Sequence, residues 1–418
     1  MTKSRSPLVI IFITIFIDLV GFGIVIPVLP LYAERYGASE ATIGILLATY
    51  SAMQFVFAPI LGKLSDRVGR RPVLLVSLIG TSIGFLIMGF APSMPVGLAL
   101  FGLAPTLVWL FVARMIDGIS GGNISTAQAY IADVTPPEER SKGMGLIGAA
   151  FGLGFVFGPM IGGMMTYISP AAPFFFASAM AAANATALYF LLPESLSHEH
   201  RSEARRRRGI IRLLEESGSW QLVAVVCTYF LATVAFAMMT ATFALFAAHR
   251  FKFDAWHTGF LFGYVGIIGA VIQGGLLGRL VKMFGDKPLT VIGTALFAVS
   301  VFGFTLSGTV VLLIVASTGI AIGNSLMTPT LNALASKSVN ASLQGRVLGV
   351  MASVASLARI IGPVLGGLLL SRDLDYSSHY GRTLYWVSSA IMLVALGVSL
   401  TIKSQRRGKA EEFVGIQG

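Results

Sequence analysis

Apolar segments of about 20 residues recur along the whole chain, each long enough to cross a hydrocarbon core about 30 Å thick as a helix. Short polar segments separate them. This pattern predicts an all-α membrane protein with twelve transmembrane helices. We expect the spans at residues 8–32, 41–62, 73–91, 105–132, 143–168, 172–193, 219–246, 257–281, 289–307, 310–336, 346–371 and 381–402.

The overall composition agrees with this pattern. Mean hydropathy is +0.80, 55% of the residues are hydrophobic and 12% are charged. A soluble domain carries about 25% charged residues, so the chain has no room for a sizeable soluble domain. Cys227 is the single cysteine, which excludes an intramolecular disulfide and argues against redox chemistry.

The positive charges are distributed unevenly between the connections. Of 30 lysines and arginines, 23 lie at the termini and in the even-to-odd connections, whereas five lie in the odd-to-even connections. The positive-inside rule then predicts that both termini are cytoplasmic in a multi-pass protein of the bacterial inner membrane. Topology accounts for the net charge of +11 without a nucleic-acid partner. No basic patch with interleaved aromatic residues is present in the sequence.

Two apolar blocks 204 residues apart carry the same signature. Residues 158–163 are Gly-Pro-Met-Ile-Gly-Gly and residues 362–367 are Gly-Pro-Val-Leu-Gly-Gly. A repeat at half the chain length predicts two homologous bundles, with the substrate site between them near the bilayer midplane. We expect two pseudo-symmetric six-helix bundles at 1–193 and 219–403, a cytoplasmic linker at 194–218 and a cytoplasmic tail at 404–418.

The connection between spans two and three has a specific spacing of glycines and charges. Residues 62–72 are Gly-Lys-Leu-Ser-Asp-Arg-Val-Gly-Arg-Arg-Pro. A basic loop that obeys topology explains the charges but not the glycines, which allow a tight turn and close helix approach. The stretch resembles the signature loop of the major facilitator superfamily. A degraded copy at 278–288 has Lys282 where the first copy has Asp66. We therefore expect the second half to lack the full charge network.

The resemblance implies a role for this loop. In that family the loop aspartate and the second-last arginine pair with an acidic residue that ends span four, which here is Asp133. We call this predicted network the gating latch, because the resemblance implies that it holds one conformation and does not touch substrate. Its expected members are Gly62, Asp66, Arg67, Gly69, Arg70 and Asp133.

Four charged residues fall inside predicted spans, namely Asp18, Arg114, Asp117 and Arg359. A charge at bilayer depth costs several kcal/mol and faces a cavity or a partner. Desolvation favours the neutral form of a carboxyl group, and a nearby arginine favours the carboxylate. A carboxyl group balanced between the two can load and release a proton. We therefore expect proton coupling at Asp18, Arg114 and Asp117, against the alternative of a static ion pair.

Two further matches narrow the resemblance. Residues 18–30, from Asp18 to Pro30, resemble the first span of the twelve-span drug:proton antiporters, especially the tetracycline exporters. Residues 114–122 resemble their R-x-x-x-G-x-x-G motif, whose arginine is thought to assist proton transfer; here it is Arg114. Asp117 stands where that motif usually has a neutral residue. The tetracycline exporters carry an intramembrane histidine in the second half, whereas all five histidines here lie in loops or at span ends.

The block in the fifth span matches the signature that marks antiporters within the superfamily. Three of its glycines recur every four residues, so they share one helix face and let another helix approach closely. Packing alone also explains that pattern; we expect this packing to seal a bundle interface. The motif residues are Gly154, Gly158, Pro159, Gly162 and Gly163.

Polar side chains at plausible cavity depth are candidate substrate contacts. A single intramembrane asparagine or glutamine more often makes an interhelical hydrogen bond. Arg359 either contacts an anionic or zwitterionic substrate, or bridges to a carboxylate across the central cavity. The candidates are Gln54, Asn123, Gln128, Gln273, Asn324, Asn332 and Arg359.

The sequence therefore predicts a secondary active transporter, a proton-coupled antiporter that exports drugs or other small amphipathic molecules. A proton symporter or facilitator for uptake of a small metabolite is the alternative, because one fold hosts many functions. No metal, nucleophile–base or phosphate-binding pattern points to an enzyme or a cofactor. The expected partners are a small-molecule substrate, protons and the lipid bilayer, and the expected state is a monomer.

Overall fold

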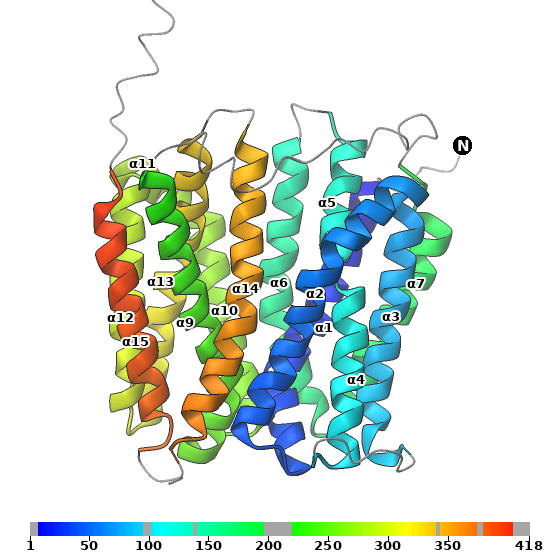
Figure 1. Ribbon diagram of the computed structural model, residues 1–418, viewed down its shortest axis with the longest axis horizontal. Coiled ribbons are helices and arrows are strands. Elements are labelled where there is room, and N and C mark those ends of the chain that lie inside the picture. Colours follow the sequence, from blue (N-terminus) through cyan, green and yellow to red (C-terminus); the bar gives the residue numbers. More distant parts are fainter. Residues whose placement is uncertain are drawn as a thin grey trace, which may run out of the picture.

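The computed structural model describes residues 7–94, 102–136, 140–195, 220–339, 343–373 and 379–403. The predicted tail and most of the predicted linker lie outside these ranges. All regular structure within them is helical (Figure 1). The elements are α1 (Pro7–Arg35), α2 (Glu40–Val68), α3 (Arg70–Phe90), η1 (Ala91–Ser93), α4 (Pro105–Ser120), α5 (Asn123–Val134), α6 (Arg140–Met165), α7 (Ala172–Leu191), α9 (Trp220–Phe251), α10 (Ala255–Val271), η4 (Ile272–Leu276), α11 (Leu277–Phe284), α12 (Asp286–Leu306), α13 (Val310–Lys337), α14 (Gln344–Leu370) and α15 (Arg382–Thr401).

In the described residues these helices form twelve spans that are long and apolar enough to cross a membrane. The count and order of the predicted spans are confirmed. Two spans are interrupted, which the apolar pattern did not show. The fourth breaks into α4 and α5 at Gly121 and Gly122, and the eighth contains the single π-helical turn η4 between α10 and α11.

One boundary prediction was wrong in an informative way. We expected residues 62–72 to form a connecting loop, but α2 continues to Val68 and α3 starts at Arg70. Gly69 alone makes the turn, with φ +115° and ψ 158°, a conformation essentially restricted to glycine. Gly62 lies inside α2, and a Cβ atom added there would meet no atom within 4 Å. The first copy of the motif is therefore mostly helix, and one glycine supplies its bend.

The two halves repeat the same packing scheme. In the first half α1 packs on α6 and α7, and α3 packs on α4 and α7. In the second half α9 packs on α14 and α15, and α12 packs on α13 and α15. Because each contact in the first set has its counterpart in the second, the chain forms the two pseudo-symmetric bundles that the sequence repeat predicts.

The closest approaches between the halves lie at one end of the molecule. The α2 and α14 helices run side by side there and separate toward the other end (Figure 1). A Cβ atom added to Gly44 would lie 2.3 Å from the carbonyl oxygen of Pro363, and one added to Gly259 would lie 2.2 Å from that of Pro159. Glycine thus permits backbone contact at two pseudo-symmetric crossings, α2 with α14 and α6 with α10.

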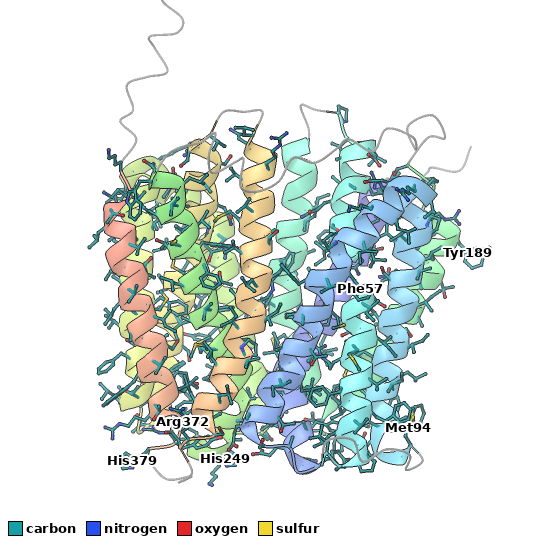
Figure 2. The ribbon with its side chains drawn as sticks, in the orientation of Figure 1. Phe57, Met94, Tyr189, His249, Arg372 and His379 are labelled. Carbon is teal, nitrogen blue, oxygen red and sulfur yellow. The ribbon has the colours of Figure 1, made fainter. Side chains whose placement is uncertain are left out.

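The Gly69 turn lies at one end of the molecule, which we call the motif end. We call the other end, where the two glycine crossings lie, the opposite end. His249, Arg372 and His379 lie together at the opposite end (Figure 2). There His249 on α9 pairs with Glu34 on α1, 2.5 Å apart, so a polar contact also joins the halves. At the motif end, a Cβ atom added to any of eight glycines in α2, α6, η4, α11 and α14 would meet no atom within 4 Å. These are Gly62, Gly145, Gly148, Gly274, Gly275, Gly278, Gly345 and Gly349.

Candidate functional site

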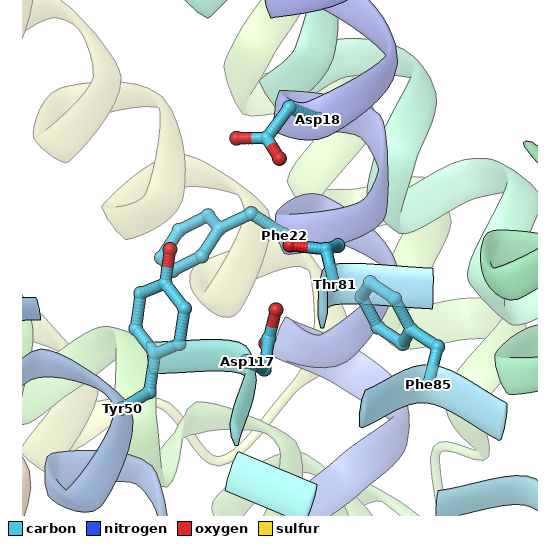
Figure 3. A pocket seen from close by; sticks show the side chains of 6 residues that line it. All are labelled: Asp18, Phe22, Tyr50, Thr81, Phe85 and Asp117. Atoms are coloured by element: carbon cyan, nitrogen blue, oxygen red, sulfur yellow. The ribbon is translucent and has the colours of Figure 1, made fainter. Parts of the chain in front are cut away.

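A small pocket inside the first bundle holds two of the predicted carboxyl groups (Figure 3). Asp18 reaches it from α1 and Asp117 from α4, and both carboxyl groups point into the same space. The pocket has room for about one water molecule, whereas a drug-sized ligand needs about 300–1,000 Å³. It therefore suits a proton better than a drug molecule. Its lining residues are Asp18, Phe22, Tyr50, Thr81, Phe85 and Asp117.

Arg114 and Asp117 form a buried ion pair at this pocket. The Arg114 Nη1 atom donates to Asp117 Oδ2 over 2.9 Å, and their side chains are 2% and 6% exposed. The two residues are three positions apart, so one helix face carries both. The Arg114 guanidinium also lies 4.4 Å from the centre of the Tyr50 ring, a cation–π contact. Asp117 thus balances the positive charge of Arg114, at a position where the resemblance would imply a neutral residue.

Asp18 has a different environment from Asp117. It makes no ion pair within the described residues. Asn123, the first residue of α5, lies beside the Asp18 carboxyl group. Asn123 is buried, and its Oδ1 atom has no hydrogen-bond partner. Asp18 therefore differs from Asp117 in having no cationic partner within the described residues.

The break in the fourth span brings Asn123 to this position. Glycine lets α2 pack closely against the break, because a Cβ on Gly118 would lie 2.5 Å from the Tyr50 carbonyl oxygen and one on Gly122 would lie 2.7 Å from Leu61. Gln54 stabilises it: its Nε2 atom donates to the Gly121 carbonyl oxygen over 2.7 Å and to the Tyr50 hydroxyl over 3.2 Å. Gln54 therefore supports the helix break and is held by protein groups.

Arg359 on α14 approaches the same region from the second half. Its Nη2 atom donates to Ser356 Oγ over 3.1 Å, one turn earlier on the helix. Tyr229 of α9 and Tyr50 of α2 lie near its guanidinium. Asn332 of α13 lies beside Tyr229. The structure thus brings Arg359 and Asn332 together with two tyrosines that the sequence analysis did not single out.

The remaining candidate contacts lie apart from this cluster. Gln128 is exposed on α5. Gln273 lies in the π-helical turn and donates to Ser325 Oγ over a long 3.5 Å. Asn324 accepts a hydrogen bond from Thr328 one turn on, over 3.0 Å. The structure gives these three side chains local partners or exposure rather than a common site.

The predicted gating latch residues meet at the motif end. Arg70 donates from Nε to Asp133 Oδ2 over 3.1 Å and pairs through Nη1 with Asp66. The same Nη1 atom donates to Ser65 Oγ over 2.8 Å. One buried guanidinium thus joins α2, α3 and α5. No ion pair of Arg67 is among those formed by the described residues.

Glu194 is a member of this network that the sequence did not reveal. Its carboxylate accepts from the backbone N–H groups of Arg70, over 2.9 Å, and Arg71, over 3.2 Å. It therefore caps the start of α3, where N–H groups lack helical partners. The neighbouring Ser195 donates to Asp133 Oδ2 over 3.1 Å. The first two residues of the predicted linker thus contact the first bundle.

The glycine block of the fifth span packs in two directions. An added Cβ on Gly154, Gly158 or Gly162 would lie 2.6 to 3.0 Å from atoms of α1, which belongs to the same bundle. A Cβ atom added to Gly163 would instead lie 2.6 Å from the Ala255 carbonyl oxygen of α10, in the other bundle. The row of three glycines therefore packs inside the first half, whereas the contact between halves is made by Gly163 and the Pro159 carbonyl.

Twelve spans in two pseudo-symmetric bundles, with buried charges at their centre, define a transporter. The model of the Major Facilitator Superfamily matches residues 11–363 and 274–415. The chain belongs to this superfamily, so it is a multi-pass membrane protein that moves small molecules. The predictions of the family, of the fold and of a transporter rather than an enzyme are confirmed.

Similar proteins agree over nearly the full length. Tetracycline resistance protein, class C, of Escherichia coli is 33% identical over 94% of this chain and 96% of that protein. Multidrug resistance protein 2 of Bacillus subtilis (strain 168) is 29% identical over 98% of each. The crystal structure of a bacterial homologue of the human lysosomal transporter Spinster, inward-facing and occupied, has a TM-score of 0.77 at 13% identity and shares the fold over 96% of this chain and 97% of that one.

Proposed function

We propose that the protein is a proton-coupled antiporter that exports drugs or similar small amphipathic molecules by alternating access. The observation that carries the proposal is the pair of carboxyl groups in the pocket of the first bundle. Asp117 is held by the Arg114 charge, whereas Asp18 has no cationic partner in the described residues. The resistance proteins named above, similar over 94% to 98% of the chain, support export as the direction.

In this proposal Asp18 carries the proton. With Asp18 protonated, the site lacks the carboxylate that would attract a cationic group. With Asp18 ionised, that attraction returns. Proton and substrate then compete for one carboxylate, and such competition gives exchange rather than cotransport when each access state binds one or the other. Arg114 and Asp117 keep their mutual charge and provide the fixed field in which Asp18 titrates.

The structure also supports an assignment of the access state. The contacts between bundles at the opposite end, Gly44 with Pro363 and Gly259 with Pro159, close that end. We assign the motif end to the cytoplasm from the 23 basic residues of the termini and even-to-odd connections. The structure then corresponds to the inward-facing state. Loosening of the two glycine crossings and closure of the motif end would produce the outward-facing state.

The remaining parts of the proposal follow from the sequence. We place the protein in the bacterial inner membrane with both termini in the cytoplasm, as a monomer whose bundles comprise residues 1–193 and 219–403. Residues 194–218 would link the bundles, and residues 404–418 would form a cytoplasmic tail.

A growth-inhibition panel in a pump-deficient bacterium tests the function. Cells that express the wild type should tolerate higher concentrations of some amphipathic compounds than cells that express Asp18→Asn at equal membrane abundance. Equal tolerance for every compound would reject export driven by Asp18. Increased sensitivity of the wild type would instead indicate uptake, the symporter or facilitator alternative.

A further inference from the structure

Arg359 brings a positive charge to the centre of the protein that no carboxylate compensates directly. Its one hydrogen bond to a side chain in the described residues goes to Ser356, a neutral hydroxyl. No ion pair of the described residues includes it. A charge at this depth requires water, a carboxylate or an anionic ligand. Arg359 as a whole is half-buried.

The surroundings of Arg359 resemble a binding surface more than a structural ion pair. Tyr229 and Tyr50 lie near its guanidinium, one from each half of the protein. Asn332 lies beside Tyr229 and adds an amide to the same region. Tyrosine and asparagine offer hydrogen bonds and an apolar ring without adding charge, so the guanidinium keeps its donors for an incoming acid.

Tyr50 connects this surface to the proton site. It lines the pocket with Asp18 and Asp117 in the first half and lies near Arg359 of the second. Asp117 is compensated by Arg114, over 2.9 Å. Two charged groups near Tyr50 therefore have no ion pair within the described residues. They are the carboxyl group of Asp18 and the guanidinium of Arg359.

The sign of the coupling then restricts the substrate class. An anion bound at Arg359 alone would favour the protonated form of Asp18, so anion and proton would bind together. That coupling gives cotransport and contradicts exchange. A substrate that also carries a cationic group at Asp18 would displace the proton instead. We infer that the protein recognises zwitterionic amphipathic molecules, whose acidic group binds Arg359 and whose cationic group competes with the proton for Asp18. This inference rests on the proposed antiport function.

A matched pair of dyes tests the inference on the purified full-length protein. One probe is a rhodamine with a free benzoate, which is a zwitterion, and the other is the methyl ester of the same dye, which is a cation. Fluorescence anisotropy measures the Kd of each dye for the wild type, Arg359→Gln, Arg359→Lys and Arg372→Gln. The last variant removes a positive charge from the exposed end of α14, outside the cavity.

The wild type should bind the acid about tenfold more tightly than the ester, the effect of one charge-assisted hydrogen bond. Arg359→Gln should abolish this preference by weakening the acid alone, Arg359→Lys should keep part of it, and Arg372→Gln should keep all of it. A wild type that binds neither dye, or binds the ester as tightly as the acid, would overturn the inference. So would an Arg359→Gln variant that keeps the preference, which would point to a structural arginine or a moving bridge.

The two proposals fail in distinguishable ways. Binding of the acid without proton release would reject antiport through Asp18, whereas proton release on binding of both dyes without a preference would reject the role of Arg359. The preference of the wild type for the acid over the ester is measured without any variant. The test therefore stands even if Arg359→Gln does not fold.

Discussion

Lys337 and Asp286 form the charge-reversed counterpart of the bridge between Asp133 and Arg70. Asp133 ends α5 and Lys337 ends α13, and the two positions are separated by the same 204 residues as the glycine blocks. Arg70 and Asp286 each follow the positive-φ glycine that starts the next helix, Gly69 or Gly285. The second half thus keeps the position of the bridge and exchanges its signs. We expected a weakened network there, and the structure shows a reduced and inverted one.

The two bridges should contribute very differently to stability. Arg70 is 10% exposed and has several partners, whereas Lys337 is 52% exposed. Breaking a buried pair costs about 3–5 kcal/mol, and an exposed pair contributes about 1 kcal/mol or less. Arg70→Ala should therefore lower the Tm of the purified protein by several degrees and Lys337→Ala by one or two. Equal shifts would contradict the difference in burial.

Gly69 and Gly285 provide a second matched comparison. Both have positive φ, +115° and +84°, but a Cβ on Gly69 would lie 2.4 Å from Glu194, whereas one on Gly285 would meet nothing within 4 Å. Gly285→Ala should carry only backbone strain, about 1–3 kcal/mol. Gly69→Ala should carry the same strain and also displace the Glu194 cap of α3. Thermal unfolding should rank Gly69→Ala as the less stable variant, and the reverse order would refute the capping role of Glu194.

The glycine crossings predict a shift in conformation rather than a loss of folding. Gly44→Ala places a methyl group 2.3 Å from a backbone oxygen, so the halves must separate at the opposite end. Spin labels at Arg35→Cys and Arg372→Cys, in a Cys227→Ser background, should then report longer distances. Gly62→Ala on the same helix has open space and serves as the control. Unchanged distances in Gly44→Ala would mean that these crossings do not control access.

The sequence predicted those features that depend on apolar length and on repeated motifs. Spans, order and pseudo-symmetry follow from apolar length and the repeated glycine block, and the Arg70–Asp133 bridge follows from one motif. Tyr50 escaped prediction although it lies four residues before Gln54, on the same helix face. A tyrosine in an apolar span looks like core packing, because its polar role depends on residues from other helices.

Glu194 escaped prediction for a related reason. It follows a predicted span and looks like a solvated linker residue, but it caps a helix 124 positions earlier in the chain. Long-range contacts of this kind depend on how the helices pack and not on local spacing. The same limit applies to Gln128, Gln273 and Asn324, whose exposure or local hydrogen bonds depend on how the helices pack.

Asp117 and Asp18 should differ in their contribution to stability. Asp117→Asn leaves the buried Arg114 without its counter-ion, which costs about 3–5 kcal/mol. The Tm should fall markedly, and the double variant Arg114→Gln with Asp117→Asn should recover much of it while remaining inactive. Asp18→Asn breaks no ion pair in the described residues and should unfold near the wild-type temperature. A large loss of stability in Asp18→Asn would indicate a structural rather than a proton-carrying carboxylate.

Proton movement in proteoliposomes tests the central claim most directly. Wild-type protein and Asp18→Asn would be reconstituted with a pH-sensitive dye inside the vesicles, and a compound exported in the growth panel would be added to energised membranes. The account predicts substrate-dependent proton flux, opposite in direction to the substrate, for the wild type and none for Asp18→Asn, with equal amounts of folded protein in both. Wild-type proton-coupled flux in the Asp18→Asn vesicles would contradict the account and remove Asp18 from the mechanism.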